Sequence, residues 1–353
     1  MTRRASLLAC PLLLLFGLSL PAWAATTGWS RFDSPGSRTY SLRYLPPSLD
    51  LSESVPFIVF LHGSGSTPEA WQPILAPLAD QLGFVVLAPR ARNFLGFGVG
   101  EDDVTIFETL ELASQDLVRD ESRTAIAGHS AGGAYAMVLA YAATSRFSGV
   151  FSLSAPYRTV VSLSDPAYTA PLRMYYGTED PNFQGGSFTA LVGQWDRLGV
   201  PLETDIQQGS GHSDWQDSTL PDGFNFLLAQ RYETEWGCVP GDKRLCLQDG
   251  RFAVEGDWRN FQGETGLARA VPLGSPDTGM LWFFRDSNWE VLIKVLNGCG
   301  VNGHHWLLLA ATTTVEYSIR VTDLATGQTE TYTNPLGNRS QAFADTTTFA
   351  ACP

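Results

Sequence analysis

Between residues 38 and 231 the chain alternates short, continuous apolar runs with stretches that have a helical period. The runs are 56–63, 84–89, 123–128, 149–155, 172–177 and 202–208, and helices are expected over 68–82, 102–118, 187–198 and 217–231. A strand that is apolar on both faces must be covered on both, which is typical of parallel sheets whose crossover connections are helices. The pattern therefore predicts an α/β fold with a doubly wound, mainly parallel sheet.

After Trp236 the pattern changes to short runs rich in Trp, Thr and Val, which are separated by Gly, Pro, Asp and Asn and have no helical period. Such runs predict a smaller all-β, sandwich-like unit. We therefore expect one domain over residues 25–236 and a second over residues 237–353.

The first 24 residues have the pattern of a signal peptide. The basic pair Arg3-Arg4 precedes a mostly apolar stretch that ends in the small-residue cleavage site Ala22-Trp23-Ala24. We expect cleavage near Ala24 and a protein that is secreted or periplasmic, with no stable membrane anchor. Loss of the two arginines takes the net charge from −13 to −15, which argues against nucleic acid as a partner.

Cys10 lies in the signal peptide, and the other four cysteines all lie after residue 237. An even number in one part of an exported chain predicts two disulfides. Among the three possible pairings we favour Cys238–Cys246 and Cys299–Cys352. A metal site is the alternative, but the chain has neither a C-x-x-C pair nor a partnered histidine spacing there, so we expect no metal.

A G-x-S-x-G sequence, Gly128-His129-Ser130-Ala131-Gly132, lies between an apolar run and a helix-forming stretch. A serine on such a strand–turn–helix projects its hydroxyl from the carboxyl edge of the sheet, and only small residues fit two positions to either side. The N-terminus of the following helix favours a developing negative charge. We predict that Ser130 is a nucleophile; the alternative is a serine in a glycine-rich turn.

A serine nucleophile needs a base. His212 is the candidate, because it follows the last apolar run of the α/β region and falls in a loop at the same sheet edge. His129 lies beside Ser130 rather than facing it, and His62 opens a loop that it would brace. The remaining histidines belong to the all-β region (His304 and His305).

The acid that orients the base is expected just after the run 172–177. Asp180 is our choice and Glu179 is the alternative. Such an acid holds the right imidazole tautomer and stabilises the imidazolium.

Two backbone N–H groups are expected to stabilise the oxyanion. One belongs to Ala131, directly after the nucleophile. The other comes from the glycine-rich LHGSGST sequence, where Ser64 is the expected donor and Gly65 the next candidate.

Together, LHGSGST, GEDDVTIFETLE, IAGHSAGGAYAMVLA, YYGTEDP and GSGHSDW resemble the secreted α/β-hydrolases that include polyhydroxybutyrate-depolymerase and feruloyl-esterase types, with the phospholipase/carboxylesterase family as near kin. The resemblance spans about residues 38–231. It implies the triad Ser130, Asp180 and His212 with Ser64 and Ala131 as oxyanion donors. The all-β region resembles a β domain attached to many exported bacterial proteins.

We therefore expect a serine hydrolase that cleaves carboxylic esters through an acyl-enzyme and needs no metal or cofactor. The ester could be polymeric or linked to a polysaccharide. The interval between residues 155 and 172 is too short for a large lid, so the site should be open, with substrate contacts from Phe94, Phe97 and Trp215. The alternatives are a serine peptidase or amidase on the same fold, and a non-catalytic surface-binding protein with a degenerate hydrolase domain.

Overall fold

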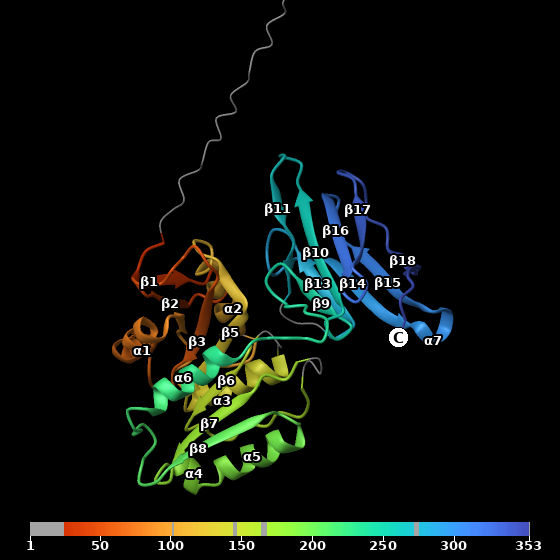
Figure 1. The fold of residues 1–353 in the computed structure, drawn as a ribbon. Helices are drawn as coiled ribbons and strands as arrows, with labels where there is room; N and C mark the ends of the chain where they lie inside the picture. Colours follow the sequence, from red (N-terminus) through yellow and green to blue (C-terminus); the bar gives the residue numbers. More distant parts are fainter. Residues whose placement is uncertain (1–24, 101, 144–146, 164–167, 272–274, 353) are drawn as a thin grey trace, which may run out of the picture.

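The computed structural model describes residues 25–100, 102–143, 147–163, 168–271 and 275–352. The expected signal peptide and its cleavage site lie outside the described residues. The first part of the chain forms an eight-stranded sheet in the order β1-β2-β4-β3-β5-β6-β7-β8 (Figure 1). Its strands are β1 (Gly28–Asp33), β2 (Tyr40–Leu45), β3 (Val55–Leu61), β4 (Val85–Pro89), β5 (Arg119–His129), β6 (Val150–Leu153), β7 (Leu172–Gly177) and β8 (Leu202–Gln207).

The strands from β4 to β8 in this order pair in parallel, whereas β1 and β2 are antiparallel to their neighbours. Helices cover both faces, and the sheet lies between two apolar cores. One face packs against α1 (Pro68–Leu82) and α6 (Thr219–Ala229). The other packs against α2 (Asp102–Leu112), α3 (Ala131–Val138) with its π-helical extension Leu139–Ala143, and α5 (Ser187–Arg197). The predicted doubly wound, mainly parallel sheet is confirmed.

Two differences from the sequence-based expectation concern the N-terminal part. Strands β1 and β2 were not predicted, because β2 contains a charged residue, Arg43, that breaks its apolar pattern. Arg43 is buried, and its guanidinium pairs with Asp116 and donates to the Ala113 carbonyl over 2.8 Å. Helix α2 also ends earlier than expected, at Leu112, because the chain turns there and joins the sheet from Arg119 onward.

The second part of the chain forms two antiparallel five-stranded sheets that enclose their own apolar core, so the predicted all-β, sandwich-like unit is confirmed. One sheet holds β9 (Leu245–Leu247), β10 (Phe252–Arg259), β11 (Thr265–Leu267), β16 (Glu316–Asp323) and β17 (Gln328–Asn334). The other holds β12 (Arg269–Ala270), β13 (Thr278–Trp282), β14 (Trp289–Gly298), β15 (His304–Ala311) and β18 (Phe343–Phe349); the short helix α7 (Cys299–Asn302) joins β14 to β15.

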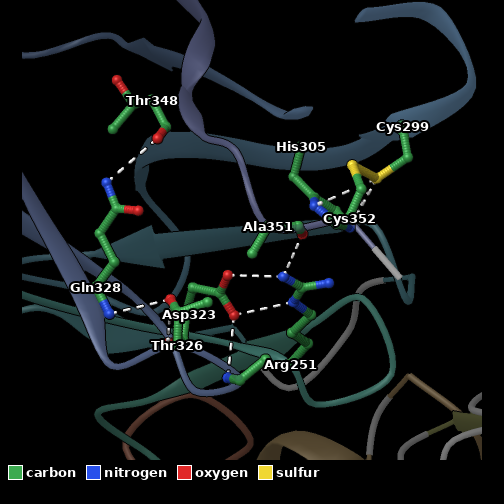
Figure 2. Close-up of polar contacts among 10 residues, drawn as sticks. Arg251, Cys299, His305, Asp323, Thr326, Gln328, Thr348, Ala351 and Cys352 are labelled. Atoms are coloured by element: carbon green, nitrogen blue, oxygen red, sulfur yellow. Dashed lines mark hydrogen bonds and ion pairs between the residues drawn. A yellow bond between two sulfur atoms is a disulfide. The ribbon is translucent and has the colours of Figure 1, made fainter. Parts of the chain in front are cut away.

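Two disulfides staple this unit, Cys238–Cys246 and Cys299–Cys352. The pairing is the one favoured from the sequence. Beside the second disulfide, Arg251 forms a bidentate ion pair with Asp323 at 2.9 and 2.7 Å and donates to the Ala351 carbonyl (Figure 2). The C-terminus is therefore held by a covalent bond and by a buried charge pair.

The all-β unit contacts the sheet domain at the amino end of β5 (Figure 1). Arg119, the first residue of β5, pairs with Asp242 at 2.8 Å, and Arg269 pairs with Glu111 near the end of α2. Ser130 follows the opposite, carboxyl end of β5. The contact between the two parts thus lies at the sheet edge opposite the candidate nucleophile. Among the helices in the described ranges, none has the length and apolarity needed to cross a bilayer.

Candidate active site

Ser130 lies in a strained turn between β5 and α3. Its φ of 53° and ψ of −121° belong to a backbone region that residues other than glycine rarely adopt. The turn is held by hydrogen bonds on both sides, from Ser130 N–H to the Leu153 carbonyl at 2.8 Å and from Ala134 N–H to the Ser130 carbonyl at 3.0 Å. This is the strand–turn–helix geometry that exposes a serine hydroxyl at the carboxyl edge of the sheet.

The glycines of the motif are required by close backbone approach. A Cβ atom added to Gly128 would lie 2.5 Å from the carbonyl group of Gly132, and one added to Gly132 would lie 2.5 Å from the His62 carbonyl oxygen. Neither position has room for a side chain, since both neighbours are backbone. The first turn of α3 therefore rests directly on the end of β3, which leads into the oxyanion loop (residues 62–67).

The candidate base and acid are in direct contact. His212 Nδ1 lies 3.0 Å from Asp180 Oδ1, and the Asp180 side chain is fully buried. Glu179, the alternative acid, is exposed to solvent. In the described part of the chain, His212 makes no hydrogen bond with Ser130; such bonds often close only when substrate binds.

The loops that bear this pair are tied to each other at the ends of β7 and β8. Glu179 N–H donates to the Ser210 carbonyl at 2.9 Å. A Cβ atom on Gly177 would overlap that same carbonyl group, so glycine is required where the end of β7 crosses the loop after β8. Only the tertiary structure reveals this crossing, because the two loops are separated by α4 (Pro181–Gln184) and α5 in the sequence.

Asn182 is a residue of the site that the sequence analysis missed. Its backbone N–H donates to Asp180 Oδ1 at 2.8 Å, and its side-chain amide donates to the Ser154 carbonyl at 2.8 Å. Asp180 is thereby the N-cap of α4, with Pro181 at the first helical position. The sequence Asp-Pro-Asn carries this signal, since Asp at an N-cap followed by Pro is a common helix start.

The oxyanion loop runs beside the nucleophile turn. The position of a Cβ on Gly63 lies 3.2 Å from Ser130 Cβ. Gly65 N–H donates to the Phe94 carbonyl at 2.9 Å, whereas no hydrogen bond in the described part of the chain engages Ser64 N–H. The choice of Ser64 as donor to a substrate oxygen stays a prediction.

His62 braces this loop, as expected from the sequence. Its Nδ1 lies 2.9 Å from the Gly63 carbonyl, and its Nε2 accepts the Ala91 N–H at 3.2 Å. Burial lowers the pKa of His62, which keeps the imidazole neutral and able to accept at Nε2.

Residues 92–100 form a loop over the nucleophile turn. A Cβ on Gly96 would lie 3.1 Å from Ala131 Cβ, and Ser64 Oγ donates to the Leu95 carbonyl at 2.6 Å. The loop is anchored by Asp102, which accepts the N–H groups of Arg92 and Gly98.

The three predicted substrate contacts have different surroundings. Phe94 is 78% exposed next to the oxyanion loop. Trp215 is half-buried and stacks on Trp71 with 6.0 Å between ring centroids. The expectation for Phe97 is wrong: this side chain is only 3% exposed and packs between His62 and Tyr135, because the loop folds it into the core beneath the site.

One group of metal-ligand residue types comes together in the described part of the chain, and it lies in the all-β unit. Cys299, His305 and Cys352 have their ligand atoms within 4.8 Å of one another (Figure 2). The two sulfur atoms are bonded to each other, so neither is available as a thiolate ligand. The imidazole of His305 instead packs against the disulfide, with Nδ1 3.8 Å from Cys299 Sγ.

No curated protein matches the chain. Among solved structures, an S-formylglutathione hydrolase from Agrobacterium tumefaciens is 18% identical with a TM-score of 0.47, over 58% of this chain and 97% of that chain. A ferulic acid esterase is 19% identical with a TM-score of 0.46, over 57% and 96%. An acetyl xylan esterase from Aspergillus awamori is 14% identical with a TM-score of 0.48, over 56% and 99%.

A family model described as the alpha/beta hydrolase family matches residues 58–315. The match begins within β3, takes in the serine turn and the loops after β7 and β8, and continues into the all-β unit. Because this match spans well over half of the 353 residues, the protein belongs to the alpha/beta hydrolase family.

Proposed function

We propose that the protein is a secreted serine esterase with Ser130 as nucleophile, His212 as base and Asp180 as acid. The observation that carries this proposal is the fully buried Asp180 carboxylate, 3.0 Å from His212 Nδ1, beside a serine in a strained turn. A buried carboxylate is costly unless it is paired, and strained serines are retained where the strain serves a purpose. A triad accounts for both features.

In the proposed reaction, Ser130 Oγ attacks the ester carbonyl carbon while His212 Nε2 removes the hydroxyl proton. The negative charge that develops on the carbonyl oxygen is stabilised by the N–H groups of Ser64 and Ala131. His212 then gives its proton to the leaving alkoxide, and the alcohol departs. Water, deprotonated by His212, then attacks the acyl carbon. The bond to Ser130 Oγ breaks, the acid is released, and His212 returns the proton to Ser130 Oγ.

Asp180 keeps the proton of His212 on Nδ1, so that Nε2 faces the nucleophile as an acceptor. During the reaction the carboxylate also stabilises the positive imidazolium. Asn182 supports this role, because its N–H holds Asp180 Oδ1 at 2.8 Å.

The substrate we propose is an ester with a short acyl chain, or a bulky aromatic or polymeric ester presented from the side. Phe94 is 78% exposed beside the oxyanion loop, and Trp215 follows His212 closely in the chain. Between the end of β6 and the start of β7 the sequence has fewer than twenty residues, which leaves no room for a large lid there. We therefore expect hydrolysis of p-nitrophenyl esters to fall steeply with acyl length, without interfacial activation. A preference for long-chain triglycerides would contradict this.

Export is supported by the basic and apolar pattern of residues 1–24 and by two disulfides, which persist in oxidising compartments. We infer that the catalytic domain comprises residues 25–236 and the all-β domain residues 237–353.

A fluorophosphonate probe tests the enzymatic proposal. Wild type should be labelled covalently, Ser130→Ala should not, and Ser287→Ala, in an exposed turn of the all-β unit, should be labelled like wild type. Unlabelled wild type would contradict a serine enzyme and favour a binding protein. A panel of p-nitrophenyl esters, methyl ferulate, acetylated xylan, polyhydroxybutyrate and peptide anilides then separates esterase from peptidase or amidase activity.

A further inference from the structure

His129, directly before the candidate nucleophile, has no part in the proposed reaction, yet its side chain is almost completely buried at the site. It is 8% exposed and lies against two indole rings. Its ring centroid is 5.5 Å from that of Trp71 on α1 and 5.6 Å from that of Trp215. An apolar ring would pack here equally well, so we expect a hydrogen bond that accounts for a buried imidazole at this position.

The polar contact of His129 is with the backbone of His212. His129 Nε2 lies 3.0 Å from the His212 carbonyl oxygen. A carbonyl oxygen only accepts hydrogen bonds, so Nε2 carries the proton and donates it. Burial lowers the pKa of His129, which keeps the ring neutral, and the carbonyl acceptor at Nε2 selects the tautomer. The same nitrogen is 3.4 Å from Ser213 Oγ, a longer contact.

His212 is consequently held by two hydrogen bonds, and its ring also packs against that of His129 with 5.0 Å between centroids. Its side chain contacts Asp180 through Nδ1 at 3.0 Å, and its main chain contacts His129 through the carbonyl at 3.0 Å. The first bond ties it to the loop after β7, and the second ties it to the turn that bears Ser130. A ring fixed only by the first bond could still move with its loop, whereas the second bond sets the distance of that loop from the nucleophile.

His129 also lies beside the oxyanion loop, since a Cβ on Gly63 would lie 3.2 Å from its Nδ1. One imidazole thus contacts the base loop (residues 208–218), lies beside the oxyanion loop, and is itself part of the serine turn. Eighty-three positions separate His129 from His212 in the sequence, so the contact exists only in the folded chain.

We propose that His129 is a positioning residue that holds the base loop against the serine turn through its Nε2–H bond to the His212 carbonyl. This inference rests on the proposed esterase function for its effect on rate. Its effect on the base loop itself does not depend on any activity.

Three substitutions separate the hydrogen bond from the packing. His129→Gln keeps an amide N–H at the same number of bonds from Cα as Nε2. His129→Asn keeps a donor that is one bond too short, and His129→Phe keeps the ring without a donor. His304→Phe is the matched control, because His304 also contacts a backbone carbonyl, that of Asn302 at 2.8 Å, but lies in the all-β unit.

The first measurement is steady-state hydrolysis of p-nitrophenyl acetate. Because a misplacement of about 1 Å costs on the order of 10²-fold, His129→Asn and His129→Phe should lower kcat by about 10²-fold with KM within about twofold of wild type. His129→Gln should keep kcat within about fivefold, and His304→Phe should match wild type. If His129→Gln is as slow as His129→Phe while both melt like wild type, the hydrogen bond is not what positions the base.

The second measurement is hydrogen–deuterium exchange of peptides that cover residues 208–218. The base loop should exchange about tenfold faster in His129→Phe than in wild type and at the wild-type rate in His129→Gln, since a loop that loses its tether opens more often. Unchanged exchange in His129→Phe would overturn the proposal even if the enzyme is active. Faster exchange in His129→Phe, combined with a wild-type protein that no fluorophosphonate labels, would instead support His129 as the tether and refute the esterase function.

Discussion

Replacement of Gly132 by alanine tests the packing of the serine turn against the sheet. The added Cβ would lie 2.5 Å from the His62 carbonyl oxygen and still closer to that of Leu61. Ordinary contacts between carbon and its neighbours begin near 3.5 Å, so the overlap is about 1 Å. Both obstacles are main-chain atoms at the end of β3, so no side chain can rotate away. Either α3 or the end of β3 must move.

The magnitude follows from overpacking in a dense interior, which costs about 1–3 kcal/mol. The backbone obstacle places Gly132→Ala near the upper end of that range. Alanine also restricts the unfolded chain more than glycine does, which favours folding by about 0.4–1 kcal/mol and partly offsets the cost of the overlap. The net loss should therefore be about 2 kcal/mol, which lowers Tm by about 4–8 °C for a domain of this size.

We expect kcat to fall even at temperatures where the variant is fully folded. Residues 61 and 62 lead into the loop that carries Ser64, so a shift of β3 moves a proposed oxyanion donor. Loss of one such donor costs about 10²–10³-fold in kcat. We expect Gly132→Ala to lower kcat by about 10²-fold on p-nitrophenyl acetate at a temperature well below its Tm.

Gly193→Ala is the matched control for this substitution. Gly193 is exposed within α5, and a Cβ there would meet no atom within 4 Å. Alanine in an exposed helix interior is more stable than glycine by about 0.5–1 kcal/mol, so Tm should rise slightly while kcat stays unchanged. Scanning calorimetry and initial rates measure both variants. A Gly132→Ala protein with wild-type Tm and kcat would refute the close approach of α3 to β3.

Three further predictions concern the acid, the disulfides and the response to pH. Asp180→Asn should lower kcat by up to about 10⁴-fold, but by less than Ser130→Ala, while Glu179→Gln keeps a kcat near that of wild type. If initial-rate assays show a large loss for Glu179→Gln and none for Asp180→Asn, Glu179 is the acid. Loss of Cys299–Cys352, which closes a loop of 53 residues, should destabilise the all-β unit by about 4 kcal/mol in urea titrations. Loss of Cys238–Cys246, which closes a loop of 8 residues, should cost about 2.5 kcal/mol, and equal effects would contradict an origin in chain entropy. Burial lowers the pKa of three histidines below the usual 6.5: His62, His129 and His305. Below that pH the unfolded chain therefore binds protons that the native state does not, so in 0.3 M salt the free energy of unfolding should be highest above pH 6.5 and fall as the pH drops towards 5.5. A flat profile would contradict burial of the neutral side chains.

Local pattern carried much of what could be predicted from the sequence. The run of small and apolar residues around Ser130 needs only neighbouring positions to form a strand, a tight turn and a helix, and the structure has that turn with Ser130 at φ 53°. The helix over residues 68–82 has its end at Gly83, which adopts the left-handed conformation that glycine favours. The order of runs and helices was also sufficient for a doubly wound sheet, because parallel strands require helical crossovers.

Contacts between distant segments were decided only by the tertiary structure. Both Asp180 and Glu179 follow the same strand, and only the folded chain buries one against His212 and leaves the other exposed. Phe94 and Phe97 occur three residues apart in one glycine-rich loop, and the turn of that loop sends one to solvent and the other into the core.

The same holds for charged residues whose partners lie far away in the chain. Strand β2 was missed because Arg43 interrupts its apolar pattern. A buried arginine is tolerated there only because Asp116 and the Ala113 carbonyl bind its guanidinium. The hydrogen bond from His129 to His212 likewise joins segments 83 residues apart. Periodicity and motif spacing describe which residues share a strand, helix or turn, because those depend on neighbouring dihedral angles. Which side chains meet across the sheet edge depends on how the loops cross in space, and that was decided by packing.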